Sequence, residues 1–112
     1  MIISGAVHKI DKLGRIVISR SLREILKIKT NDLFEVYVSK GNVMIKKFSF
    51  ADFSDLDAII KEENYISGAI HPVDNLGRIV IPSCLREFLG FTPGVKCELY
   101  LEDGIIVAKK FE

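Results

Sequence analysis

The chain has 112 residues, of which 48% are hydrophobic and 28% are charged, and its formal net charge is +1. These values are typical of a soluble globular protein, and the length suits one ordinary domain or two very small ones. No apolar run approaches membrane-spanning length, and the first residues leave no room for a signal peptide. Two cysteines make no disulfide framework. We therefore expect a reduced, cytoplasmic protein with no membrane contact.

One stretch of eight residues occurs twice in this chain. Asp11–Ile18 reads DKLGRIVI, and Asp74–Ile81 reads DNLGRIVI. The offset of 63 positions holds without a gap from residue 3 to residue 48, and roughly half of the paired positions are identical. The chain therefore reads as two copies of one unit.

Each copy is close to the lower size limit for a core of its own, which is why small units need a metal, disulfides or a partner. The second copy is the obvious partner. We therefore expect repeat 1 (1–48) and repeat 2 (66–112) to share one core, with a connector (49–65) between them.

The first half of repeat 1 predicts two strands around a tight turn. Ala6–Ile10 alternates loosely between apolar and polar residues, as in a strand. Asp11–Gly14 reads as a turn, because glycine takes positive φ at no steric cost. Arg15–Ile18 is β-branched and apolar, which predicts a strand that is covered on both faces.

A short amphipathic helix should begin after Ser19. Leu22, Ile25 and Leu26 fall at the spacing i, i+3, i+4, which places them on one face of about two helical turns. Ser21 and Glu24 have the spacing of a capping box.

The second half of repeat 1 predicts a hairpin. Phe34–Val38 alternates as a half-buried strand, Lys40–Asn42 forms the turn, and Val43–Phe48 is the last strand. Repeat 2 follows the same order, with clearer turn and cap signals at Pro82, Gly90, Pro93–Gly94 and Asp103–Gly104.

The connector is acidic and has helical spacing at Phe53, Leu56 and Ile60. We expect a helix of about ten residues that crosses one face of the shared core. Its acidic residues also make it a candidate docking surface for a protein partner.

Positive charge is concentrated in repeat 1. Residues 3–48 contain ten Lys and Arg against four Asp and Glu, whereas residues 66–111 contain five of each. A basic half favours a polyanionic partner, although any single lysine is more often simply solvated.

The string Leu-Gly-Arg-Ile-Val-Ile-Pro-x-x-Leu-Arg at 76–86, matched in register by repeat 1, resembles the AbrB/SpoVT family of swapped-hairpin DNA-binding domains. The resemblance covers about four fifths of the chain. Family members usually carry one unit per chain and form an interleaved homodimer. The resemblance thus implies an α+β, mostly β fold in which the repeats interleave as an intrachain pseudo-dimer barrel. Pairing between two chains, and further homo-oligomers, remain open.

The resemblance also implies a DNA-binding transcriptional regulator of prokaryotic type. Arg15 and Arg78 match the arginine after the turn glycine, and Arg23 and Arg86 match the first helix arginine. Arginine suits phosphate or guanine because its planar fork donates two parallel hydrogen bonds. The further candidates for contact with duplex DNA are Lys9, Lys12, Arg20, His8 and His71.

This chain departs from the family's pattern in charge. The family often has arginine where His8 and His71 stand, and a second helix arginine where Glu24 and Glu87 stand. Repeat 2 also lacks the counterparts of several repeat 1 cations. Every phosphate that the protein leaves unneutralised lowers the salt dependence of binding, so we expect lopsided binding with repeat 1 as the main anchor.

Structural roles compete with these functional ones. Arg15 and Arg78 could pair with Asp11 and Asp74 to brace the turns. The helix arginines could be solvated, and the histidines could be hydrogen-bonded or face solvent. The remaining polar and aromatic positions have structural explanations as small buried residues, edge protection or cross-strand packing: Cys84 and Cys97, Lys46–Lys47 and Lys109–Lys110, Tyr37 and Tyr100.

Catalysis and metal chemistry find little support. The sequence has no nucleophile-elbow string, no phosphate-cradling glycine loop and no clustered metal ligands, so we expect no enzyme activity, no cofactor and no metal. A site formed by His8, Asp11 and their counterparts is disfavoured, because positions i and i+3 of a strand point to opposite faces. The alternative function is an antitoxin or another protein-interaction module.

Overall fold

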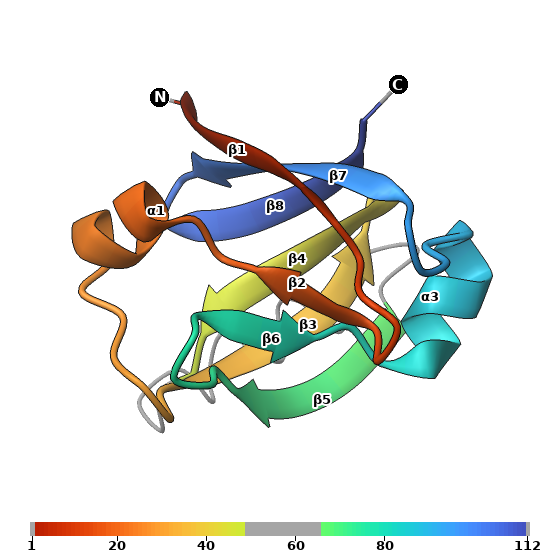
Figure 1. Cartoon of the computed structure of the whole chain (residues 1–112), viewed down its shortest axis with the longest axis horizontal. Helices are drawn as coiled ribbons and strands as arrows, with labels where there is room; N and C mark the ends of the chain where they lie inside the picture. Colours follow the sequence, from red (N-terminus) through yellow and green to blue (C-terminus); the bar gives the residue numbers. More distant parts are fainter. Residues whose placement is uncertain (1, 49–65, 112) are drawn as a thin grey trace.

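The structure, a computed structural model, describes residues 2–48 and 66–111. These residues are mainly strands with two short helices, which confirms the expected α+β, mostly β class (Figure 1). The first range contains β1 (Ile2–Lys9), β2 (Arg15–Val17), α1 (Arg20–Ile25), β3 (Leu33–Ser39) and β4 (Asn42–Lys47). The second contains β5 (Ile66–Pro72), β6 (Arg78–Val80), α3 (Ser83–Leu89), β7 (Lys96–Glu102) and β8 (Ile105–Lys110).

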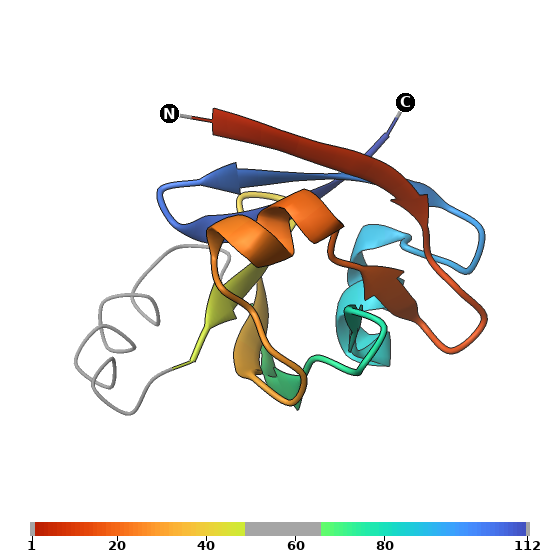
Figure 2. The ribbon, with the colours of Figure 1, turned by 60° about the vertical axis from the view of Figure 1, so that its left-hand side comes forward.

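The strands form a six-stranded antiparallel sheet in the order β1-β7-β8-β4-β3-β5 and a two-stranded ribbon, β2-β6. Strands that precede residue 49 pair with strands that follow residue 65 throughout: β1 with β7, β2 with β6, β3 with β5 and β4 with β8. The ribbon crosses the middle of the molecule, and α1 and α3 lie at opposite sides of it (Figure 1). Figure 2 turns the α1 side forward.

Both hairpin turns have two central residues with positive φ. Lys40 and Gly41 have φ values of 54° and 80°, and Asp103 and Gly104 have 52° and 79°. Two consecutive positive φ angles match the twist of the flanking strands, which explains the Lys-Gly and Asp-Gly pairs. The predicted hairpins are present, except that Asn42 belongs to β4 and not to the turn. The expectation that Phe34–Val38 is half-buried is wrong, because β3 is buried along its whole length from Phe34 to Ser39.

The helices start differently from the expectation for repeat 1. Ser19 is the N-cap of α1, and its hydroxyl lies 3.3 Å from that of Ser21 instead of bonding a helix N–H. Glu24 pairs with Arg20, so the predicted capping box is wrong. In repeat 2, Pro82 precedes the helix and Gly90 ends it in the left-handed conformation, as predicted.

The core draws equivalent side chains from both repeats. Ile16 and Ile79 face each other across the ribbon and are both buried. The prediction that Arg15–Ile18 is covered on both faces is wrong, because Arg15 and Val17 remain half exposed. Other large side chains in the core include Ile18 and Ile81, Leu22 and Leu85, Phe34, Leu99 and Ile106.

Two further expectations need correction. The lysine pairs 46–47 and 109–110 do not protect sheet edges, because β4 and β8 are central strands and the edges are β1 and β5. Cys97 is buried as expected, but Cys84 is exposed. Burial raises the pKa of the Cys97 thiol to about 11, slightly offset by the charge of Lys110, so this thiol stays protonated at neutral pH.

The tyrosines on β3 and β7 pack across strands, as predicted. Tyr37 is buried and lies opposite Met44, and Tyr100 is half-buried opposite Val107. The predicted connector helix lies outside the described residues. Among the residues described, no helix has the length and apolarity needed to cross a bilayer.

Candidate nucleic-acid interface

The turn before β2 is organised by one carboxylate. Asp11 Oδ1 accepts hydrogen bonds from the backbone N–H groups of Leu13, at 2.9 Å, and Arg15, at 2.8 Å. Its Oδ2 accepts the Nε–H of Arg15 at 2.7 Å. Gly14 closes the turn with φ of 79° and donates its N–H to the carbonyl of Asp11. This carboxylate therefore fixes both the turn and the guanidinium group that follows it.

The turn before β6 repeats this arrangement. Asp74 accepts the N–H groups of Leu76, at 3.0 Å, and Arg78, at 2.8 Å, and the Nε–H of Arg78 at 2.6 Å. The bracing pair that the sequence left open is thus formed in both repeats. Among the described residues, the terminal nitrogens of both arginines have no hydrogen-bond partner, so each guanidinium keeps donors for a ligand.

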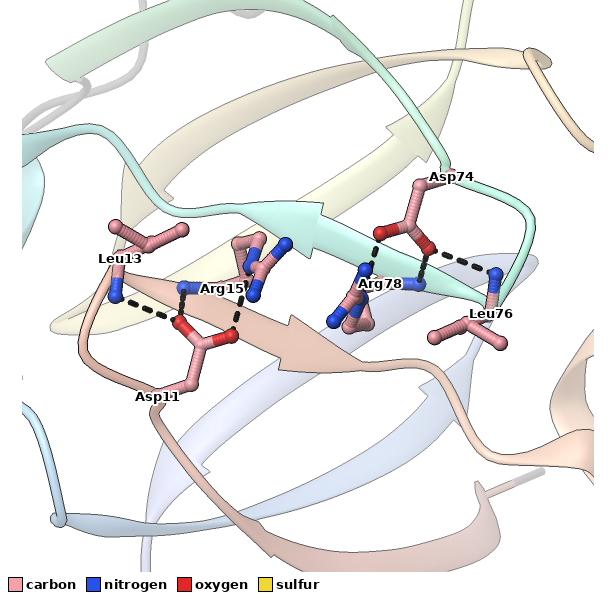
Figure 3. A network of polar contacts seen from close by, with 6 residues as sticks. All are labelled: Asp11, Leu13, Arg15, Asp74, Leu76 and Arg78. Atoms are coloured by element: carbon pink, nitrogen blue, oxygen red, sulfur yellow. Dashed lines mark hydrogen bonds and ion pairs between the residues drawn. The ribbon is translucent and has the colours of Figure 1, made fainter.

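The two arginines lie on one face of the ribbon. Ile16 and Ile79 point into the core, and strand alternation places Arg15 and Arg78 on the opposite, outward face. Figure 3 shows both guanidinium groups over this face between the two turns. Their side chains are 25% and 27% exposed, which leaves them accessible although they are paired.

The hydrogen bonds keep both carboxylates ionised. Burial alone would raise the pKa of Asp11, but the backbone N–H of Arg15, its side chain and the N–H of Leu13 together lower that pKa below the ordinary 3.8. The pKa of Asp74 is lowered by the same balance, with Arg78 and Leu76 as donors. Each turn therefore carries a preformed ion pair at neutral pH.

The helix arginines are partly buried and hydrogen-bonded, which corrects the alternative that they are simply solvated. Arg23 is half-buried and donates Nε–H to the carbonyl of Ile18 at 2.9 Å. Arg86 donates in the same way to Ile81 at 2.8 Å. Both side chains are therefore fixed at the ends of the ribbon strands.

The remaining cations lie at the surface of repeat 1. Lys9, Lys12 and Arg20 are exposed, and Arg20 makes a 3.1 Å ion pair with Glu24 in which both side chains are largely solvated. Arg20 also contributes to an open pocket of about 340 Å³ that is lined mainly by charged residues: Arg20, Arg23, Glu24, Lys27, Ile28 and Lys29.

The two histidines differ from each other. His71 Nε2 lies 2.7 Å from the carbonyl oxygen of Gly68, whereas His8 Nε2 is buried without a hydrogen-bond partner. The expectation of a hydrogen-bonded or solvent-facing group is therefore not met at Nε2 of His8. In the described part of the chain, neither ring bonds to a candidate arginine, and no group of three or more His, Cys, Asp or Glu could hold a metal ion.

One feature of the turns is absent from the sequence-based site. Leu13 and Leu76 stand at the ends of the ribbon and are 67% and 59% exposed (Figure 3). The sequence could have indicated these exposed leucines, because a large apolar residue occupies the same turn position in both repeats, where a polar residue would be usual.

Sequence comparison places these features in a family. Over 103 residues, or 91% of this chain, the sequence is 34% identical to stage V sporulation protein T of Bacillus subtilis. The chain belongs to the AbrB/SpoVT-like family. This AbrB/SpoVT-like chain is also 42% identical over 45 residues, 40% of its length, to the transition state regulatory protein AbrB of the same organism.

These matches span about half the length of the curated relatives, 53% and 47% respectively. No family model matches the chain. Among solved structures, PHS018 of Pyrococcus horikoshii superposes with a TM-score of 0.53 at 18% identity, covering 100% of this chain and 98% of that one. That likeness concerns the fold of the AbrB/SpoVT-like chain alone.

Proposed function

We propose that the chain is a cytoplasmic, DNA-binding transcriptional regulator that docks on duplex DNA through the outward face of the β2–β6 ribbon. The supporting observation is the pair Arg15 and Arg78, held at Nε by Asp11 and Asp74 on one face, with their terminal nitrogens available. A preorganised guanidinium loses little entropy when it binds a phosphate or a guanine edge. One of the relatives, AbrB, is named as a regulatory protein, which agrees with this role.

We also propose that the two repeats form an intrachain, swapped-hairpin pseudo-dimer barrel with one shared core. The pairing of β1 with β7, β3 with β5, β4 with β8 and β2 with β6 supports this organisation. Two similar turns then face two half-sites on DNA, as in symmetric dimeric DNA-binding proteins. Further homo-oligomers are compatible with this arrangement.

Repeat 1 should be the stronger anchor. Lys12, Arg20 and Lys27 are exposed around its turn and helix, and their counterparts in repeat 2 are Asn75, Ser83 and Gly90. Because phosphate contacts provide most of the salt-dependent affinity, the two half-sites are held unequally. Phosphates then set position, and DNA shape contributes to sequence preference. His8 and His71 lie half-buried on the edge strands β1 and β5 and are further candidates for contact with DNA.

A protein-interaction role, such as that of an antitoxin, is the second candidate. It is favoured by exposed apolar side chains at equivalent helix positions, Ile25 and Phe88, which are 49% and 62% exposed. The acidic connector is a further docking candidate outside the described residues. A toxin gene next to the gene for this chain would favour this second role.

A mobility-shift titration against mixed genomic fragments at two salt concentrations tests the DNA-binding role. The double variant Arg15→Ala/Arg78→Ala should bind more weakly, and the slope of log K against log salt should fall by about 0.9 for each phosphate that is no longer neutralised. The matched control is Lys46→Ala/Lys109→Ala, which removes the same charge from equivalent positions on the central strands. Unchanged binding and salt dependence in the arginine variant would show that the proposed face is wrong.

A further inference from the structure

Each turn glycine is covered by the helix arginine of the other repeat. A Cβ built on Gly77 would lie 2.7 Å from Cζ and Nε of Arg23, and one built on Gly14 would lie 2.5 Å from the same atoms of Arg86. Real Cβ atoms do not approach other atoms this closely. The missing side chain therefore creates the space in which the opposite guanidinium lies.

Hydrogen bonds at the ribbon ends tie the same three groups together. Ile18 donates its N–H to the carbonyl of Gly77 at 2.8 Å and accepts the Nε–H of Arg23 at 2.9 Å. Ile81 does the same between Gly14 and Arg86, with both distances at 2.8 Å. Each helix is thus connected through a single isoleucine to the turn of the other repeat.

These contacts are selective for the arginine that makes them. The planar guanidinium covers the glycine backbone while its Nε points to the isoleucine carbonyl, an arrangement that the point charge of lysine cannot reproduce. Arg20 offers an internal comparison, because it is on the same helix, is exposed and pairs only with Glu24 in the described structure.

We propose that Arg23 and Arg86 are positioning residues that act crosswise: Arg86 sets the turn that presents Arg15, and Arg23 sets the turn that presents Arg78. The role in DNA binding rests on the proposed function, but the positioning itself can be measured without DNA. Residues in one repeat then control how the half-site of the other repeat is bound.

The first test uses backbone amide NMR of the full chain. Arg86→Lys should shift the amide signals of Leu13, Gly14 and Arg15 and leave the turn at 74–78 unchanged, while Arg23→Lys should do the reverse. Arg20→Lys is the control and should shift neither turn. Perturbation confined to the variant's own repeat would overturn the proposal.

A thermal comparison covers the case in which the arginine variants do not fold. Gly14→Ala should lower the melting temperature several degrees more than Gly41→Ala. Both glycines have nearly the same φ, 79° and 80°, but a Cβ on Gly41 meets nothing within 4 Å. Equal losses would show that Arg86 is not held against the turn.

The second test is a double-mutant cycle for DNA affinity. If Arg86 acts through Arg15, the fold-loss caused by Arg86→Lys should shrink toward one in the Arg15→Ala background. The own-repeat pair, Arg15→Ala with Arg23→Lys, should give independent losses. Coupling within a repeat and not across would refute crosswise positioning. If the wild type binds no DNA while the NMR pattern is crosswise, only the proposed function fails.

Discussion

At the scale of single residues, the chemistry of the ribbon face depends on Asp11 and Asp74. Each carboxylate accepts three hydrogen bonds, two from the backbone and one from an arginine. The aspartate at the start of each turn could be recognised from sequence as a turn former. The sequence did not decide whether the aspartate also binds the arginine four residues later. Such a pair at the surface forms only where the backbone places the carboxylate and the guanidinium next to each other.

These carboxylates predict a loss of stability in acid. Both have a folded-state pKa below the ordinary 3.8, so their ionised forms stabilise the folded state above that value and the contribution is lost as pH falls through the folded pKa. In denaturant titrations at pH 7, Asp11→Asn/Asp74→Asn should lower the free energy of unfolding by about 1 kcal/mol per turn.

The loss is small because the Asp11 and Asp74 side chains are 34% and 32% exposed and solvent screens both ion pairs. The difference between variant and wild type should narrow as the pH falls from about 4 through the folded pKa of the two carboxylates. A difference that stayed the same throughout the acid titration would mean that the carboxylate charge contributes nothing.

At the scale of elements, the β2–β6 ribbon has one face packed against the core and one face that carries the two turn arginines. Its inward side chains are Ile16 and Ile79, and its outward ones include both arginines. After the arginine, the sequence of each copy is apolar on both faces of the strand, which predicted burial on both faces. The structure instead leaves Arg15 and Val17 half exposed, because no helix or strand within residues 2–48 and 66–111 covers the outward face of the ribbon.

This division predicts unequal costs for neighbouring substitutions. Ile16→Ala should lower the free energy of unfolding by about 2–5 kcal/mol, because it leaves a cavity at a fully buried site. Val17→Ala, on the half-exposed face, should cost about 1 kcal/mol or less. Chemical denaturation measures both, and similar costs would contradict the assignment of the two faces.

At the scale of the whole molecule, the strands of one repeat are completed by the other. In the described residues, β1 pairs with β7 and β2 pairs with β6, so repeat 1 by itself would leave both strands without partners. The size of the unit already indicated this dependence, because about 46 residues bury too little apolar surface to offset chain entropy.

Residues 1–48 expressed alone should therefore form a homodimer or remain unfolded. Sedimentation equilibrium gives the mass, and circular dichroism at the same concentration reports the strands. The full chain measured in parallel is the control. A stable, folded monomer of the fragment would contradict the shared core.

Local features of this protein were determined by the sequence itself. The turns at Gly14 and Gly77, the hairpins at Gly41 and Gly104 and the helix end at Gly90 all follow from positive φ, a property of the residue and its neighbours. The edge strands, the exposed Cys84 and the missing capping box were not foreseen, because each depends on which elements become neighbours in space.

Only the tertiary structure decided which helix arginine contacts which turn glycine. Arg23 and Arg86 have the same local sequence, and so do Gly14 and Gly77, so the order of residues along the chain cannot tell a contact within a repeat from one between repeats. Strand pairing across the ribbon resolves this, because it carries the end of each strand to the opposite turn. The crossed contacts are thus a consequence of topology acting on two copies that share the same turn and helix residues.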